Sequence, residues 1–404
     1  MAVKAGQILH DAYGFVIDRI QTGGPTSLNI PEEKIYELGN FETVATVRDA
    51  PDLSFDLDTF DVSTEIEALL TFTDPTATVN GDEFDFGNHI PMDVISPIKD
   101  GWDIFTASRG VVLPYLTLEN STYRFEIGGN ASQRHTLRGD SIFFVDGSPY
   151  YEEFSGDGST ATFNFANTAQ VYAYSGDNHY ALGACVVFSD GTYQRLFLGE
   201  HFTNTSGGIT ILDPATTTPV GSTLKIVYGS ATPSTYAQTV HEDTSVKPAA
   251  VRGRDVDIYV GTNDATPVFT RWTSVQSAEV TWSVTLDKDE EFGNAQYVSQ
   301  DHDVPEVSGN VVIRPRDTAE LWQRIQEVTN VTAGTVAGPL TSVGLPMEIR
   351  VSDPDTGVRL KTLYVPDARF QPPAIEGRVQ QKTEPTFEWT SDGGNLLIYK
   401  GARP

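Results

Sequence analysis

The chain has 404 residues and is strongly acidic, with 55 Asp and Glu residues against 27 Lys and Arg residues and a formal net charge of −28. Such a charge repels nucleic acid, which excludes proteins that grip DNA through its phosphates. The single cysteine, Cys185, excludes an intrachain disulfide framework, and no apolar run is long enough to span a membrane as a helix.

The choice among charged residues is also biased, with nine Lys against eighteen Arg and 32 Asp against 23 Glu. Low Lys with abundant Asp is typical of proteins kept soluble in concentrated salt, where counterions screen self-repulsion. An ordinary acidic protein has the same signature, so a halophilic source and an ordinary one both stay open. Charged residues also interrupt the N-terminal segment, and we expect no secretion signal there.

Strands are expected at residues 12–22 and within 34–47. The segment Gly23–Ser27 between them combines Gly, Pro and Ser and is predicted to be a turn. Apolar and polar residues then alternate, which indicates a strand with one buried face. The buried face would consist of Leu53, Phe55 and Leu57. The other face would carry Ser54, Asp56 and Asp58.

Two short helices are predicted where the spacing of apolar residues changes from that of a strand to that of one face of a helix. The first spans Asp61–Leu70, with Asp61 or Ser63 as its cap. The second begins at Asp317–Glu320, which has the spacing of a capping box. The residues expected on the buried stripes are Ile66, Leu69 and Leu70 in the first helix and Leu321, Trp322 and Ile325 in the second.

The remaining segments are expected to be strands separated by Gly, Asn and Asp turns. In the first 150 residues these are 93–96, 102–107, 111–118, 123–127 and 142–145. Short, regularly spaced strands at 159–165, 171–174, 184–188, 193–198, 208–212 and 223–228 predict a small sandwich or barrel. Further strands are expected at 255–260 and 279–286.

The chain contains a long-period duplication, which decides the architecture. Landmarks recur in the same order at an offset of 254 or 255 residues: Gly39-Asn40 with Gly293-Asn294, Pro51 with Pro305, Ile90–Val94 with Leu345–Ile349, and Gly139–Gly147 with Gly393–Gly401. We therefore predict a mainly β protein. It would have two tandem β-sandwich or barrel modules at 1–150 and 251–404, each with one α-helix, and a small β-sandwich domain at 151–250 between them.

No motif for catalysis, a metal or a cofactor stands out. The acidic run Asp52–Asp61 lacks the spacing of a calcium loop, and the seven His residues are scattered. There is no nucleophile elbow and no phosphate-binding loop. We expect no enzyme, although carboxylates are so numerous that a polysaccharide-cleaving pair stays open as an alternative.

Arg48–Phe55, followed by Asp61–Glu67, resembles the tail tube proteins of long-tailed viruses. The resemblance covers about 1–150 and, more weakly, 251–404, where Arg314-Pro315-Arg316 replaces Phe60-Asp61-Val62. It implies a structural virion protein whose modules form six-membered rings, stacked into a conduit for genome delivery. With two modules per chain, a trimer would build one ring, and a hexamer stays the alternative.

The resemblance implies that the chain contacts other copies of itself and other tail proteins. Viral DNA would pass along it without binding, and no membrane would be involved. An acidic lining of the bore would repel phosphates. The candidates for that lining are Ser54, Asp56, Asp58, Ser308 and Asn310, unless the same face looks outward to solvent. The middle domain would decorate the tube, bind host glycans or brace its neighbours. A tail-tip or baseplate hub and a cell-surface adhesin are the alternative functions.

Overall fold

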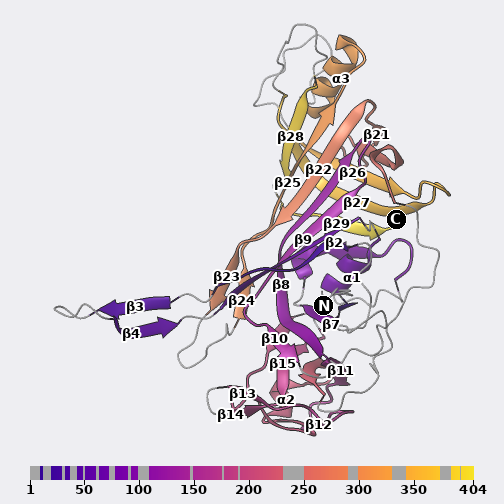
Figure 1. The fold of residues 1–404 in the computed structure, drawn as a ribbon. Helices are drawn as coiled ribbons and strands as arrows, with labels where there is room; N and C mark the ends of the chain where they lie inside the picture. Colours follow the sequence, from indigo (N-terminus) through magenta and orange to yellow (C-terminus); the bar gives the residue numbers. More distant parts are fainter. Residues whose placement is uncertain are drawn as a thin grey trace.

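The computed structural model describes the protein at residues 10–11, 20–29, 32–36, 43–48, 51–60, 63–71, 78–89, 92–98, 109–145, 149–174, 177–189, 192–230, 250–289, 299–329, 343–373, 384–391 and 393–404. Strands dominate these residues, so the fold is mainly β, as predicted. In Figure 1 a steep, twisted sheet fills the centre, α3 (Thr318–Thr329) caps its upper end, and the strands of the middle segment lie at the lower end.

Two four-stranded antiparallel sheets with the same strand order build the centre of the molecule. The first consists of β2 (Ile20–Asn29), β5 (Asp52–Thr59), β9 (Ser132–Gly139) and β8 (Arg109–Glu126). The second consists of β22 (Val275–Ser283), β25 (Glu306–Ile313), β28 (Thr386–Ser391) and β27 (Arg359–Phe370). Antiparallel pairing of β8 with β22 joins them into one continuous sheet.

The other strand pairs recur in the same way. Hairpin β3–β4 (Glu32–Tyr36, Thr43–Arg48) has its counterpart in β23–β24 (Leu286–Asp289, Ser299–His302). On β8 lie β7 (Met92–Ile98) and β10 (Phe143–Val145), as β26 (Gly344–Ser352) and β29 (Leu397–Lys400) lie on β27. Strands β1 (His10–Asp11) and β20 (Val256–Val260) then pair with β7 and β26. The duplicated sequence is thus a duplicated strand order.

One sequence match is displaced by two residues. Strand β7 pairs Met92 with Leu116, and the equivalent pair in the second copy is Leu345 with Ala368. Met92 therefore corresponds to Leu345 and not to Met347. The apolar pattern of the two segments is the same in either alignment, because both alternate with a period of two.

A single hydrophobic core runs through both copies. Leu53, Phe55 and Leu57 are buried in it, as the alternation predicted. In the second copy Gly309 lies opposite Trp389, and a Cβ at this position would come within 2.6 Å of the indole ring. Glycine therefore leaves the space that the Trp389 side chain and the backbone of the neighbouring strand occupy.

The two helices differ in how much they bury. In α1 (Glu65–Leu70) every residue from Ile66 to Leu70 is buried. In α3 the buried side consists of Arg324, Ile325, Val328 and Thr329, and Leu321 packs partly against the core. The prediction for Trp322 is wrong, because its side chain is 50% exposed. Arg324 takes the inner position instead, with its guanidinium 5.8 Å from the centre of the Trp272 ring.

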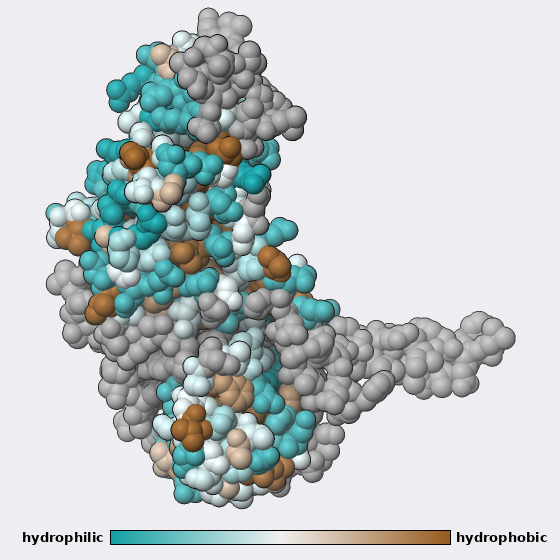
Figure 2. Space-filling model, turned by 180° about the vertical axis from the view of Figure 1, so that it is seen from behind, coloured by the Kyte–Doolittle hydropathy of each residue, from teal (hydrophilic) through white to brown (hydrophobic). Residues whose placement is uncertain are grey.

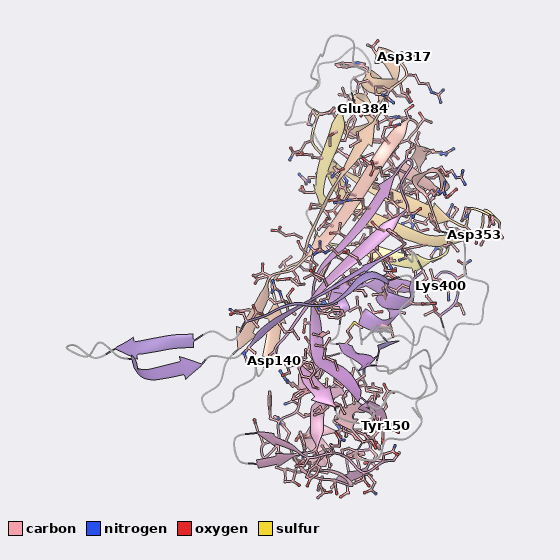
Figure 3. The ribbon with its side chains drawn as sticks, viewed as in Figure 1. Asp140, Tyr150, Asp317, Asp353, Glu384 and Lys400 are labelled. Carbon is pink, nitrogen blue, oxygen red and sulfur yellow. The ribbon has the colours of Figure 1, made fainter. Side chains whose placement is uncertain are left out.

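The helix starts follow the capping signals in part. The Asp317 carboxylate, labelled at the upper end of Figure 3, accepts a 2.8 Å bond from the Glu320 N–H. Glu320 reaches back to the N–H of Arg316, at 2.7 Å, and so completes the box one residue early. In the first helix the Ser63 hydroxyl accepts from the Glu65 N–H at 3.4 Å, while Asp61 lies outside the described residues.

Three expectations for the first copy need correction. Gly23–Ser27 is not a turn but the middle of β2, where register shifts accommodate it beside β5. The two strands expected at 111–118 and 123–127 are one strand, β8, which passes from the β7 sheet into the central sheet. Strand β9 was not expected, because polar residues occupy both of its faces. The segments 12–19 and 102–107 lie outside the described residues.

The middle segment forms its own small sheets and core. One sheet has the order β11 (Pro149–Ser155), β19 (Thr223–Gly229), β15 (Ala181–Val187), β16 (Tyr193–Arg195), and the other β12 (Thr162–Asn164), β18 (Gly208–Ile211), β17 (Phe202–Thr205). Sequence reasoning missed β11 and β17. The domain boundaries at residues 150 and 250 stay predictions.

Short elements complete the described chain. They are hairpin β13–β14 (Tyr172–Tyr174, Asp177–His179), β6 (Glu83–Asp85), β21 (Thr270–Arg271), α2 (Pro214–Thr217), and the 3-10 turns Phe86–Asn88 and Gly253–Asp255. None of the described helices is long and apolar enough to cross a membrane. Figure 2 shows that hydrophilic side chains cover most of the described surface of that view, with hydrophobic ones in small separate patches.

Candidate functional site

One face of the central sheet is polar across both copies. Strand registers align Asp58 with Arg134, Arg134 with Thr122, and Thr122 with Thr281. The same row continues to Ser308. A second row joins Arg124, Glu279, Asn310 and Glu388. The five residues predicted to line a bore therefore share one face, although they come from strands about 250 residues apart.

The five differ in exposure. Ser54 and Asp56 are 7% and 9% exposed, whereas Asp58, Ser308 and Asn310 are half-buried. Asp56 is covered because Arg134 donates to it at 2.8 Å and the Thr136 hydroxyl at 2.7 Å. Its carboxylate is held within the sheet surface and not presented as an isolated charge. The exposed carboxylates of the face are those of Glu126, Glu306 and Glu388.

Carboxylates outnumber guanidinium groups on this face. The acids are Asp52, Asp56, Asp58, Glu119, Glu126, Glu279, Glu306 and Glu388, and the bases are Arg124, Arg134, Arg138 and Arg369. Arg124 and Arg138 pair with Glu279 and Glu119, each at 2.8 Å. The bond to Glu119 raises the pKa of Arg138. Arg124, Arg134 and Arg138 are thus each engaged by a neighbouring carboxylate, and the face as a whole stays acidic.

Sequence reasoning missed most of this face. In β9 the inward-facing residues include Gln133 and His135, which are polar like the outward-facing Arg134 and Thr136. The alternation of apolar and polar residues that would indicate a strand is therefore absent. The alternation of β22, in which Ala278, Val280 and Trp282 are buried, was the available signal.

A buried polar cluster holds the two copies together on the inner side of the sheet. Lys361 of β27 donates to Glu67 of α1 at 2.6 Å and to Gln133 of β9 at 3.0 Å. The Tyr123 hydroxyl donates to the same Glu67 oxygen at 2.8 Å. Lys361 and Glu67 are 1% and 0% exposed, so the pair is fully desolvated. A buried ion pair fixes the relative placement of its elements, because separating the partners leaves an uncompensated charge.

His135 lies at the edge of this cluster. Its Nδ1 is 2.8 Å from the Ser121 hydroxyl. Burial lowers the pKa of His135 to about 4, with a smaller opposing effect from Glu67 and a smaller reinforcing effect from Lys361. Burial also raises the pKa of Tyr123 well above its usual value. At neutral pH His135 is therefore uncharged, and Lys361 is the cation that Glu67 needs.

A second buried pair attaches the middle segment to the first copy. Arg195 of β16 binds both carboxylate oxygens of Asp140, and its guanidinium lies 4.8 Å from the centre of the Tyr115 ring. Tyr115 has φ +58° at the bend where β8 leaves the β7 sheet. A non-glycine residue stays in this region only when its surroundings fix it, and Arg195 belongs to those surroundings.

Among the described residues, no three His, Cys, Asp or Glu side chains are grouped closely enough to hold a metal ion. The chain matches no family model and no curated protein. Two solved structures are similar to part of it. One is the tail of an empty GTA particle with C6 symmetry, 14% identical, covering 36% of this chain and 97% of that chain, TM-score 0.24. The other is the six-fold symmetrised anti-feeding prophage baseplate, 10% identical, covering 36% and 91%, TM-score 0.26.

Proposed function

We propose that the chain is a structural, non-catalytic subunit of a virus tail. Three copies form a hollow ring, and stacked rings form the tube through which the genome passes. The observation that carries this proposal is the joint between the two copies within one chain, where β8 pairs with β22 along seven residue pairs.

That joint is directional, which favours a ring. The β8 edge of one copy meets the edge of the next copy that corresponds to β2, so the two copies contribute different surfaces. When such a contact is repeated from chain to chain, it produces a closed ring if the rotation between successive chains adds up to a full turn. At the start of the strand order, β2 pairs with β5 alone among the described residues. An open edge of this kind invites a further strand, and ring closure supplies one.

The polar face suits the wall of a DNA channel. Its carboxylates outnumber its guanidinium groups, and Arg124, Arg134 and Arg138 are engaged by neighbouring acids. An acidic wall gains no counterion-release affinity for DNA, so the genome would slide without sticking. In this arrangement Ser54, Asp56, Asp58, Ser308 and Asn310 belong to the wall of the bore. The middle segment, attached through Asp140 and Arg195, decorates the tube.

Electron microscopy of the purified protein tests the proposal. Hollow rings or filaments with threefold end views are the expected result, because each chain contributes two modules. A single ring species that never stacks would favour a tail-tip or baseplate hub over a tube. A monodisperse monomer in low and high salt alike would overturn the ring and favour an adhesin or an enzyme.

A further inference from the structure

Two aromatic side chains on the described surface are open to solvent, although both lie on elements that pack inward. Phe144 of β10 is 76% exposed and Trp322 of α3 is 50% exposed. The other large hydrophobic residues exposed on the described surface are aliphatic. Large aromatic residues are enriched at protein interfaces, where they act as anchors.

The duplication shows what covers the counterpart of Phe144. Phe144 pairs with Val111 of β8, and the equivalent pair in the second copy is Ile398 with Leu363. Ile398 is 0% exposed and belongs to the core that runs through both copies, and β6, a strand of the first copy, pairs along the outer edge of β29. Across that edge Ile398 faces Phe84. Among the described residues, β10 pairs with β8 alone.

The two helices also differ in burial, but here the first copy is the covered one and the second copy is the exposed one. Helix α1 of the first copy is buried from Ile66 to Leu70, and Lys361 of the second copy binds its Glu67. Helix α3 of the second copy has no third copy behind it in the same chain, and Trp322 is left open. The register of β8 and β10 places Arg109 where β27 and β29 place Lys361. A basic residue therefore stands at the corresponding position of the first copy.

We propose that the Phe144 surface of one chain packs against the Trp322 side of α3 in a second copy of this chain. The contact repeats between chains the joint inside one chain, where β6 pairs with β29 and Lys361 of β27 binds Glu67 of α1. It rests on the proposed ring and names the residues that close it. Because the two surfaces differ, each chain offers one of each, and three chains satisfy all of them in a closed ring.

Charge insertion at either anchor tests the contact. Phe144→Lys and Trp322→Lys should each weaken association on the order of thirtyfold or more, the scale of losing one buried aromatic anchor. Val220→Lys and Val358→Lys serve as matched controls, since these residues are 78% and 62% exposed and lie outside both surfaces. Mass is measured by light scattering after size exclusion, and circular dichroism verifies that each variant is folded.

Mixing the two anchor variants makes the test specific. Each variant alone should be monomeric. The mixture should give dimers but no closed rings, because the intact α3 of F144K meets the intact β10 surface of W322K. Rings that form normally with either lysine, or a mixture that stays monomeric, would overturn this contact. Native protein that never assembles would instead overturn the proposed ring, so the two failures are distinguishable.

Discussion

At the scale of single residues, burial decides behaviour more than residue type does. Asp56 carries the same charge as Asp58, yet two donors from β9 hold it at the sheet surface. His135 is fully buried, and its neutral form is favoured because a charged imidazole there would lose its hydration. The acidic character of the chain is therefore expressed through only some of its carboxylates, those that remain at the surface.

His135 should make the fold sensitive to mild acid. Its pKa is about 4 in the folded chain and 6.5 in the unfolded one. Below pH 6.5 the unfolded chain takes up a proton that the folded chain refuses. Stability from this residue is thus full above pH 6.5, falls as the pH drops towards 4, and loses about 3 kcal/mol in total.

Urea unfolding of the protein and of His135→Gln between pH 4 and 8 measures this effect. The difference in unfolding free energy between the two should narrow as the pH falls, because the variant lacks the titrating group. Parallel curves over the whole range would contradict the assignment. The many carboxylates affect both proteins alike, so the comparison isolates the imidazole.

At the scale of elements, equivalent segments of the two copies have different neighbours. Helix α1 is buried from Ile66 to Leu70 and binds Lys361 of the second copy, whereas α3 stands at the end of the sheet and leaves Trp322 exposed (Figure 1). The same holds for β29, which has β6 on its outer edge, and for β10, which pairs with β8. Position in the assembled order, and not the local sequence, sets how much of each element is covered.

Lys361→Met should destabilise the joint between the copies. It leaves the Glu67 carboxylate buried without its cation, and we expect a loss of about 3–5 kcal/mol. The double variant Glu67→Gln/Lys361→Met should recover much of that loss, since neither charge remains. Chemical unfolding of the three proteins gives the numbers.

The surface pair of Arg271 with Asp257 provides the control, because both side chains are more than a third exposed. Arg271→Met should cost no more than about 1 kcal/mol. A Lys361→Met variant as stable as this control would mean that the buried pair does not hold the copies together.

At the scale of the whole molecule, the distribution of charge matters as much as its sum. Polar residues of β5, β9, β8, β22, β25 and β28 meet on one face because the two sheets join at β8 and β22. Neither copy has that face at its full width alone. The joint thus creates both a wide acidic wall and the directional contact from which a ring can grow.

Reversing charge on the wall should make assembled rings retain DNA. Glu126→Lys/Glu388→Lys places two cations on the exposed part of the face, and binding should appear at low salt and fall steeply as salt rises. Asp213→Lys/Asp264→Lys changes the net charge equally at exposed sites off this face. Equal DNA retention by both pairs would show that the wall has no special access to DNA.

Much of the architecture could be predicted from the sequence because it depends on local patterns. Alternation in residues 53–58 identified a strand and its buried face, and the spacing Asp317–Glu320 marked the start of a helix. Those patterns mislead where a polar residue is buried because it contacts a segment far away in the sequence. Gln133 and His135 face the core to serve the Lys361 cluster, which hid β9, and Gly23–Ser27 resembles a turn although β5 holds it in a strand.

By itself the sequence determined the mainly β class, the duplication and the strong negative charge, because composition and the pattern of residue types along the chain encode these properties. Only the tertiary structure decided that β8 and β22 fuse two sheets into one polar face. It alone paired Lys361 with Glu67 across 294 residues. It also left Trp322 and Phe144 exposed, because burial at these positions depends on which segment lies alongside, and no local pattern records that choice.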